Sequence, residues 1–146
     1  MELAKILLVE DNPSAILLTK HAFKSSKLIN NFMVAEDGEK ALQILFKEGD
    51  YTDAPTPDLV LLDLNIPKIE GREVLKTIKE SDKLKRIPVV IMSGSKAERD
   101  IVETYDLHAN CYIIKPLDLQ KLSEVAQKID DFWFSLVKLP PHKNED

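Results

Sequence analysis

Cysteine, glycine and an excess of basic charge are all missing or scarce in this sequence. Its single cysteine, Cys111, excludes an intrachain disulfide and a zinc site built from several cysteines. The 20 basic side chains are outnumbered by 25 acidic ones, so the formal net charge is −5. A surface that follows nucleic-acid phosphates needs an excess of Lys and Arg, and we therefore expect no nucleic-acid partner. With four glycines in the whole sequence, there is no glycine-rich loop to bind a nucleotide phosphate.

Long hydrophobic runs and targeting signals are also missing. No apolar stretch reaches the length of a membrane-spanning helix, and residues 1–5 carry no signal-peptide pattern, so we expect a cytoplasmic protein with no membrane partner. Hydrophobic residues make up 44% and charged residues 31%, which is typical of a globular domain. The length predicts one domain, over residues 1–138. The proline-rich, charged segment 139–146 is expected to be a disordered tail.

The segment over residues 57–67 is central to the predicted fold. Residues 59–62 form an uninterrupted apolar run, which predicts a strand buried on both faces, as in a parallel sheet. Asp63 follows this run, and Pro67 and Gly71 predict a turn just beyond it. Open α/β folds bind ligands at the carboxyl ends of their strands, so Asp63 is a candidate site residue. Taken alone, Asp63 could equally serve only to satisfy the turn.

Strand patterns and helix patterns alternate along the chain. Buried strands are predicted over residues 6–9, 32–35, 59–62, 88–92 and 111–114. Each is followed by a predicted helix, over residues 13–25, 39–47, 72–80, 97–107 and 118–137. Five strand–helix repeats predict an α/β fold, namely a doubly wound, five-stranded parallel sheet with five helices. The strand order 2-1-3-4-5, which is the flavodoxin-like order, is the common one for five strands.

This strand order brings three acidic side chains to one edge of the sheet. Glu10 and Asp11 follow the first strand and Asp63 ends the third, and these two strands are neighbours in the predicted order. Crowded carboxylates repel one another unless a cation offsets their charge. Mg²⁺ is a hard divalent ion that suits oxygen ligands of this kind, so we predict a Mg²⁺ site. The alternative is a solvated acidic loop that binds no ion.

A lysine and a hydroxyl group are expected beside the acids. Ser93 follows the fourth predicted strand and Lys115 follows the fifth, and both side chains suit an anion with phosphate geometry. Asp63 would lie between the cation ligands and the anion ligands, and a carboxylate can act as a nucleophile toward phosphorus. The predicted product is an acyl phosphate on Asp63, with Lys115 and the metal neutralising the charge of the transferred group.

The strand ends together resemble the receiver domain of two-component response regulators. The resemblance covers residues 4–130 and rests on Val9-Glu10-Asp11-Asn12, Leu62-Asp63-Leu64-Asn65-Ile66-Pro67, Gly71, Ser93 and Lys115-Pro116. It implies that Asp63 accepts a phosphoryl group from a sensor histidine kinase. It also implies that Mg²⁺ is held by the carboxylates of Glu10, Asp11 and Asp63 and by the carbonyl group of Asn65.

The resemblance further implies a conformational switch. The residue matching Ser93 binds the phosphoryl oxygens, the match to Lys115 pairs with them, and the ring matching Tyr112 turns inward. Physically, the new dianion attracts the Ser93 hydroxyl, and the vacated space admits a ring. Tyr112 could instead be a half-buried strand residue with no such role. A protein of this kind is a signalling phosphoacceptor rather than an enzyme for an external substrate, and it catalyses only its own phosphorylation and dephosphorylation.

Other segments are similar to the small single-domain regulators of bacterial phytochromes, best known in cyanobacteria. These segments are Gly71-Arg72-Glu73-Val74-Leu75, residues 86–90, residues 105–113, and Phe132-Trp133-Phe134-Ser135-Leu136. The similarity implies a phytochrome-type sensor histidine kinase as the partner. Because the residues after 138 are too few for a second domain, we expect the regulator to act through its own surface.

The predicted last helix carries more apolar residues than one narrow stripe can hold. The excess around Phe132, Trp133 and Phe134 favours a contact with another protein surface. We predict a homodimer through the face formed by the last helix and the fifth strand. The alternative is that this helix only covers the core.

Two other functions are compatible with the same kind of fold. Haloacid-dehalogenase-type phosphatases also use an Asp nucleophile, Mg²⁺, a hydroxyl group and a lysine. They need a second Asp two positions after the nucleophile, where this chain has Asn65, which cannot transfer protons. The other alternative is a binding module that works without phosphorylation, and the presence of the acidic pair, Asp63 and Lys115 argues against it.

Overall fold

The computed structural model describes residues 4–24, 29–94, 98–115 and 118–135. Its strands are β1 (Ala4–Val9), β2 (Ile29–Ala35), β3 (Leu59–Asp63), β4 (Val89–Ser93) and β5 (Cys111–Ile114). They form one parallel sheet in the order β2-β1-β3-β4-β5, which confirms the predicted α/β fold and strand order. The predicted tail and the domain boundary at residue 138 lie outside the described residues.

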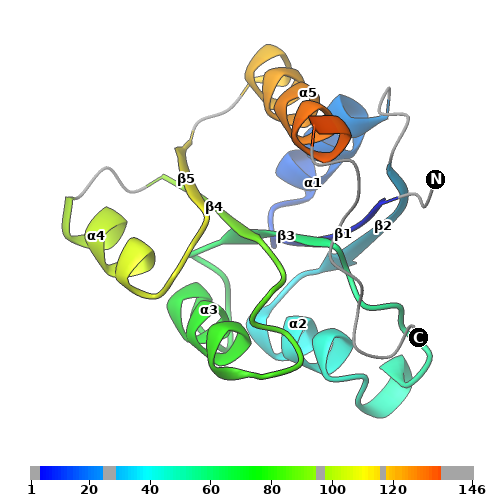
Figure 1. Ribbon diagram of the computed structural model, residues 1–146, viewed down its shortest axis with the longest axis vertical. Helices are drawn as coiled ribbons and strands as arrows, with labels where there is room; N and C mark the ends of the chain where they lie inside the picture. Colours follow the sequence, from blue (N-terminus) through cyan, green and yellow to red (C-terminus); the bar gives the residue numbers. More distant parts are fainter. Residues whose placement is uncertain (1–3, 25–28, 95–97, 116–117, 136–146) are drawn as a thin grey trace.

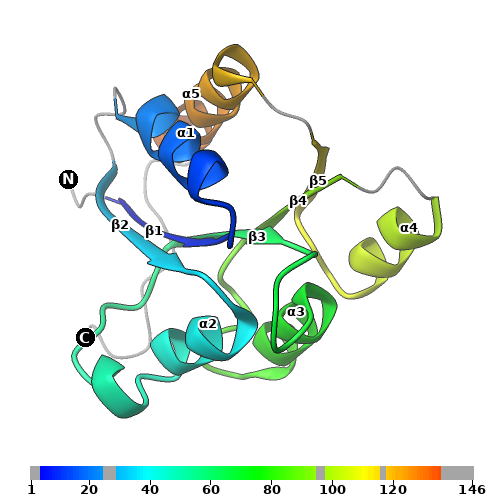
Figure 2. The same cartoon turned by 180° about the vertical axis from the view of Figure 1, so that it is seen from behind.

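Helices cover both faces of the sheet. They are α1 (Pro13–Phe23), α2 (Gly38–Leu45), α3 (Gly71–Glu80), α4 (Glu98–Asp106) and α5 (Leu119–Ser135), with a short 3₁₀-helix, η1 (Gly49–Tyr51). α1 and α5 pack on one face, α2 and α3 on the other, and α4 lies beside β5 (Figure 1). Figure 2 shows the same layers from behind. No helix in the described part of the chain is both long and apolar enough to cross a membrane.

The core is divided in two by the sheet, because successive strand residues point to opposite faces. Val60 and Leu62 of β3 pack with residues of α2 and α3, whereas Leu59 and Leu61 pack with residues of α1 and α5. All four side chains are buried. β3 is therefore covered on both faces, as its apolar run predicted, and Asp63 emerges at its carboxyl end.

Side-chain caps set the starts of three helices. Asn12 accepts a hydrogen bond from the Ala15 amide at 3.1 Å, and the next residue, Pro13, occupies the first turn of α1. Asp37 caps α2 by accepting from the Lys40 amide at 2.7 Å. Asp118, directly before α5, accepts a hydrogen bond from the Lys121 amide at 2.8 Å.

Two local features differ from the prediction. β2 begins at Ile29, three residues before the predicted start, because Ile29 and Asn31 pair with β1 on either side of an irregular step in the register. The β-strand propensity of these residues alone does not predict a strand here, because pairing with a neighbouring strand decides whether such a segment is extended. The 3₁₀-helix η1 also lies inside the segment that was expected to be an irregular loop.

Candidate functional site

The sheet brings four strand ends to one edge. β1 and β3 are neighbours, and Val9 is in register with Leu62, so Glu10 follows β1 beside Asp63. Asp63 is in register with Met92 of β4, and Ser93 is in register with Ile114 of β5. The residues that were singled out from the sequence are therefore delivered to this edge by separate loops.

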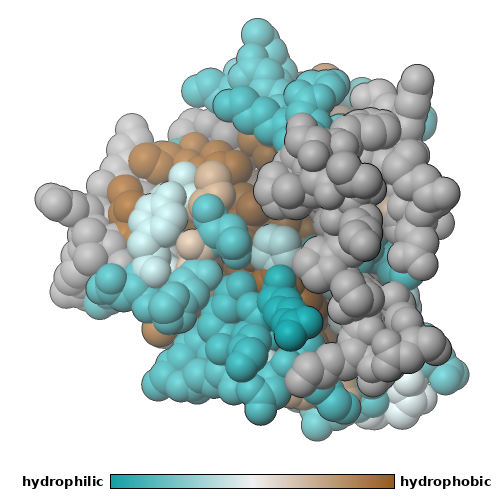
Figure 3. Space-filling view, in the orientation of Figure 1, coloured by the Kyte–Doolittle hydropathy of each residue, from teal (hydrophilic) through white to brown (hydrophobic). Residues whose placement is uncertain are grey.

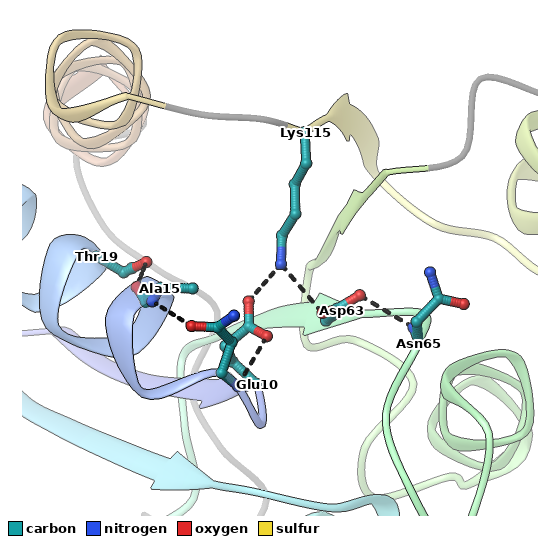
Figure 4. Close-up of polar contacts among 7 residues, drawn as sticks. Glu10, Ala15, Thr19, Asp63, Asn65 and Lys115 are labelled. Atoms are coloured by element: carbon teal, nitrogen blue, oxygen red, sulfur yellow. Dashed lines mark hydrogen bonds and ion pairs between the residues drawn. The ribbon is translucent and has the colours of Figure 1, made fainter.

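Lys115 joins the acids of two strands. Its Nζ donates a short hydrogen bond to Glu10 Oε1 and a second one, at 3.0 Å, to Asp63 Oδ2 (Figure 4). Glu10 and Asp63 are only 2% and 5% exposed. A buried carboxylate is costly unless it is paired, so the ammonium group of Lys115 neutralises charge that the fold has removed from water. The predicted proximity of these three residues is observed.

The pKa values of this trio reflect burial and mutual contact. Burial raises the pKa of the Glu10 carboxyl, and although the hydrogen bond from Lys115 acts in the opposite direction, the pKa stays above its usual value. Burial alone would lower the pKa of the Lys115 amine, but its hydrogen bonds to Glu10 and Asp63 outweigh this effect and raise the pKa. Lys115 is therefore held in its charged form beside the two acids.

Asp11 completes a set of oxygen donors. Carboxylate oxygens of Glu10, Asp11 and Asp63 all lie within 4.8 Å of one another, and Asp11 is the exposed member. Three carboxylates at this spacing fit a hard divalent cation that keeps part of its water shell, because the open side at Asp11 is reached by solvent. The donor set is thus consistent with the predicted Mg²⁺ site.

Asn65 lies on the other side of Asp63 from Glu10 (Figure 4). Its backbone amide donates to Asp63 Oδ1 at 3.0 Å, while Oδ2 accepts from Lys115. Both oxygens of Asp63 are therefore occupied by donors that arrive from different loops, and the carboxylate cannot rotate without breaking one of these bonds.

Ser93 and Tyr112 share one face of the sheet, the side covered by α2 and α3. Tyr112 is half-buried and packs against the core cluster on the α2 and α3 side, together with Ile91, its register partner. Ser93 is two residues beyond Ile91 and is fully buried, so alternation assigns it to the same face as Tyr112. The Ser93 carbonyl accepts a hydrogen bond from the Lys115 amide at 2.7 Å, which connects the ends of β4 and β5.

A pocket of about 510 Å³ adjoins the trio on the side of α1 and α5. Glu10, Lys115 and Gly94 line it together with residues of α1 and with Leu122 of α5. Among the residues that the structure describes, none apart from its neighbours in the chain lies within 4 Å of the position that a Cβ atom of Gly94 would take. A phosphate-sized group could approach Lys115 through this pocket.

One residue with a supporting role was missed by sequence reasoning. The backbone amide of Asn12 donates to Glu10 Oε2 at 3.4 Å, and its side chain caps α1. Asn12 therefore ties the first acidic loop to the start of α1. Its place directly before Pro13 is a helix-start signal that could have indicated this role.

One further sequence prediction falls outside the described residues. The structure does not describe the side chains of Phe132, Trp133 and Phe134. The predicted contact surface at the end of α5 is therefore untested by this structure.

Comparison with known proteins agrees with the fold. The sequence model of the family described as response regulator receiver domain matches residues 6–127, and the chain belongs to this family. It is 43% identical over 135 residues to response regulator Rcp1 of Synechocystis sp. (strain ATCC 27184 / PCC 6803 / Kazusa), covering 92% of each chain. The chain is thus a receiver domain of the two-component signalling type, related to phytochrome response regulators.

Solved structures give the same result. The phosphorylated cyanobacterial phytochrome response regulator RcpA superimposes with a TM-score of 0.86 at 47% identity, over 95% of this chain and 99% of that one. The Mn²⁺-bound form of response regulator Rcp1 superimposes with a TM-score of 0.84 at 42% identity, over 94% and 99%. The sequence resemblance to receiver domains, and to the phytochrome regulators among them, is confirmed.

Proposed function

We propose that this protein is a response regulator that accepts a phosphoryl group on Asp63 from a phosphohistidine of a phytochrome-type sensor histidine kinase. The observation that carries the proposal is that Asp63 lies beside the carboxylates of Glu10 and Asp11 and accepts a hydrogen bond from the Lys115 ammonium group. Relatives described as phytochrome response regulators, one of them phosphorylated, support the choice of partner and reaction.

In the proposed transfer, a carboxylate oxygen of Asp63 attacks the phosphorus atom. The new P–O bond forms as the P–N bond to the kinase imidazole breaks, and the imidazole nitrogen keeps the electron pair and takes up a proton from water. Lys115 Nζ, which already contacts Asp63, pairs with the phosphoryl oxygens as charge develops on them. The product is an acyl phosphate, which water later hydrolyses.

The same proposal includes a Mg²⁺ ion held by the carboxylates of Glu10, Asp11 and Asp63 and by the Asn65 carbonyl. Bound there, the ion would supply positive charge that offsets both the clustered acids and the phosphoryl group. The spacing of the three carboxylates supports it, and the relative Rcp1 is described in a Mn²⁺-bound form.

We further propose that phosphorylation changes the surface near β5 through Ser93 and Tyr112. The phosphoryl group would attract the Ser93 hydroxyl, and the Tyr112 ring would move into the space that Ser93 leaves. The shared face of these residues supports this coupling, because both belong to the side of the sheet covered by α2 and α3.

Homodimerisation is proposed through the face of α5 and β5. Figure 3 shows hydrophobic residues gathered over β5, between α4 and α5. A groove of about 640 Å³ runs between β5 and α5, lined by Ile113, Val125 and Ile129 among others, and Ile114 is 39% exposed. An apolar surface of this kind favours a protein contact. The protein is proposed to act in the cytoplasm, where a histidine kinase obtains ATP.

The phosphoacceptor is tested by mass spectrometry. The protein is incubated with Mg²⁺ and acetyl phosphate, and we expect an adduct of about 80 Da that hydroxylamine removes. Asp63→Asn should form no adduct, whereas Asp53→Asn, a change at an exposed acid in the segment before β3, should react like the natural protein. An adduct that persists in Asp63→Asn would contradict the assignment. Continuous turnover of the donor without an adduct would instead indicate a phosphatase.

A further inference from the structure

The connection between β2 and α2 contacts both loops that carry the proposed metal ligands, although it contributes no ligand itself. We call residues 35–38 the β2–α2 turn. At its start, the Ala35 carbonyl accepts a hydrogen bond from the Glu10 amide at 3.0 Å. At its end, the Gly38 amide donates to the Pro67 carbonyl at 3.2 Å. Glu10 belongs to the loop after β1, and Pro67 belongs to the loop after β3.

Gly38 touches the loop after β3 more closely than any side chain would allow. A Cβ atom at this position would lie 2.1 Å from the Ile69 carbonyl oxygen and 2.8 Å from Ile69 Cβ. Contacts this short cannot be relieved by rotating a side chain, since the nearest atom is backbone. Figure 2 shows the start of α2 beside the connection from β3 to α3. The absence of a side chain at Gly38 therefore sets how near the two backbones lie.

The turn is itself firmly anchored. Asp37 caps α2 through the Lys40 amide at 2.7 Å, and its second oxygen is 3.7 Å from Lys68 Nζ in the loop after β3. Lys68 adopts a positive φ of 69°, which a lysine seldom does, so contacts around it hold this part of the loop in place. The loop after β3 is thus attached to the start of a helix as well as to its own strand.

We propose that the β2–α2 turn is a brace that holds the loop after β1 and the loop after β3 at the separation needed for a divalent cation. Gly38 is its positioning residue. The inference rests on the proposed function, because it assumes that Glu10 and the Asn65 carbonyl are ligands of one ion. If the brace is loosened, the ion must order the loop after β3 as it binds, and the affinity falls by that cost.

The proposal is tested by Mn²⁺ binding, measured as the loss of the electron paramagnetic resonance signal of free Mn²⁺. We expect Gly38→Ala to bind Mn²⁺ about 10-fold more weakly than the natural protein, as for other changes around a metal site that leave its ligands intact. In the metal-free protein, hydrogen exchange of the Asn65 amide should become faster, because the added methyl group displaces the loop that carries this amide.

Leu84→Ala is the control variant for a general loss of stability. Leu84 is 3% exposed and lies between α3 and β4, at the opposite edge of the sheet from the site. This variant should lower the unfolding temperature while its Mn²⁺ affinity stays within about twofold of the natural value. Equal losses of affinity in Leu84→Ala and Gly38→Ala would show that Gly38 acts only through stability, and would overturn the proposal.

A second pair of variants tests the turn without adding an atom between Gly38 and Ile69. Asp37→Ala removes the cap of α2 and should weaken Mn²⁺ binding about threefold, whereas Asp37→Asn keeps the cap and should restore most of the affinity. An equal loss in both variants would mean that the negative charge matters and not the brace. If the natural protein binds no Mn²⁺, the proposed metal site fails as well; if it binds and Gly38→Ala binds equally well, only the brace fails.

Discussion

The two sides of the site are held in different ways. The cation side, formed by the loops after β1 and β3, is fixed by backbone contacts that reach the β2–α2 turn and α1. The anion side has Ser93 at the end of β4 and Lys115 after β5. There, a 2.7 Å hydrogen bond from the Lys115 amide to the Ser93 carbonyl links the two backbones, and contact with the acids is made by a long, flexible side chain.

This difference suits a switch. A cation site gains affinity when its ligands are already in place, because no binding energy is spent on ordering them. A group that must respond to a new phosphoryl oxygen has to move, and a lysine on its flexible four-carbon stem can do so without changing the backbone. We infer that the rigid side sets metal affinity and the mobile side reports phosphorylation.

Lys115→Gln should separate the two sides most clearly. It leaves Glu10 and Asp63 buried without their cation, so metal-free protein should lose about 3 kcal/mol of unfolding free energy. Phosphorylation by acetyl phosphate should slow by about 100-fold, as when a donor to a developing oxyanion is removed. Mn²⁺ affinity should be kept or increased, because the competing ammonium group is gone. Loss of Mn²⁺ binding in a folded Lys115→Gln protein would show that the two sides are not separable.

Asp11→Asn should change Mn²⁺ affinity and stability in the directions opposite to Lys115→Gln. It removes one carboxylate from the cation side, and Mn²⁺ affinity should fall by about 10-fold. The metal-free protein should become slightly more stable, because one of three repelling charges is gone. Chemical unfolding with and without Mg²⁺ measures both effects. A variant that binds the ion as the natural protein does would remove Asp11 from the proposed ligand set.

Ser93→Ala tests the mobile side with a smaller change. Ser93 is fully buried, and the loss of its hydroxyl should still permit an acyl phosphate on Asp63. The phosphorylation-dependent change in the environment of Tyr112, followed by NMR, should be reduced several-fold. Ser123→Ala, an exposed change on α5, is the matched control and should leave the change intact. An unaltered response in Ser93→Ala would exclude Ser93 from the switch.

Much of this arrangement could be predicted from the sequence, for a physical reason. Each buried strand is marked by an apolar run, and parallel strands bring their carboxyl ends to one edge, so Glu10, Asp63 and Lys115 could be placed together without coordinates. The brace could not be predicted, because the contact of Gly38 with Ile69 joins segments far apart in the sequence and depends on how α2 packs. Local patterns likewise missed the first residues of β2, which are strand only because β1 is beside them.

The smallest expected effect is the pH dependence that Glu10 contributes. Burial raises the pKa of its carboxyl in the folded protein above the ordinary value of 4.5. Between the ordinary pKa, which applies to the unfolded chain, and the raised pKa of the folded protein, the folded protein binds more protons than the unfolded chain. The stability that this carboxyl contributes is therefore present below pH 4.5 and is lost as the pH rises through the folded pKa. In the absence of metal, the unfolding free energy of Glu10→Gln should therefore not show this fall as the pH rises.

The measurement is the difference in unfolding free energy between the natural protein and Glu10→Gln as the pH is raised from acid to neutral. Groups that do not contact Glu10 titrate alike in both proteins and cancel in that difference. The difference should shift in favour of Glu10→Gln as the pH rises, and Mg²⁺ should reverse the shift, because an ion stabilises the natural carboxylate and gains less from an amide. A pH-independent difference would mean that Lys115 fully offsets the burial of Glu10.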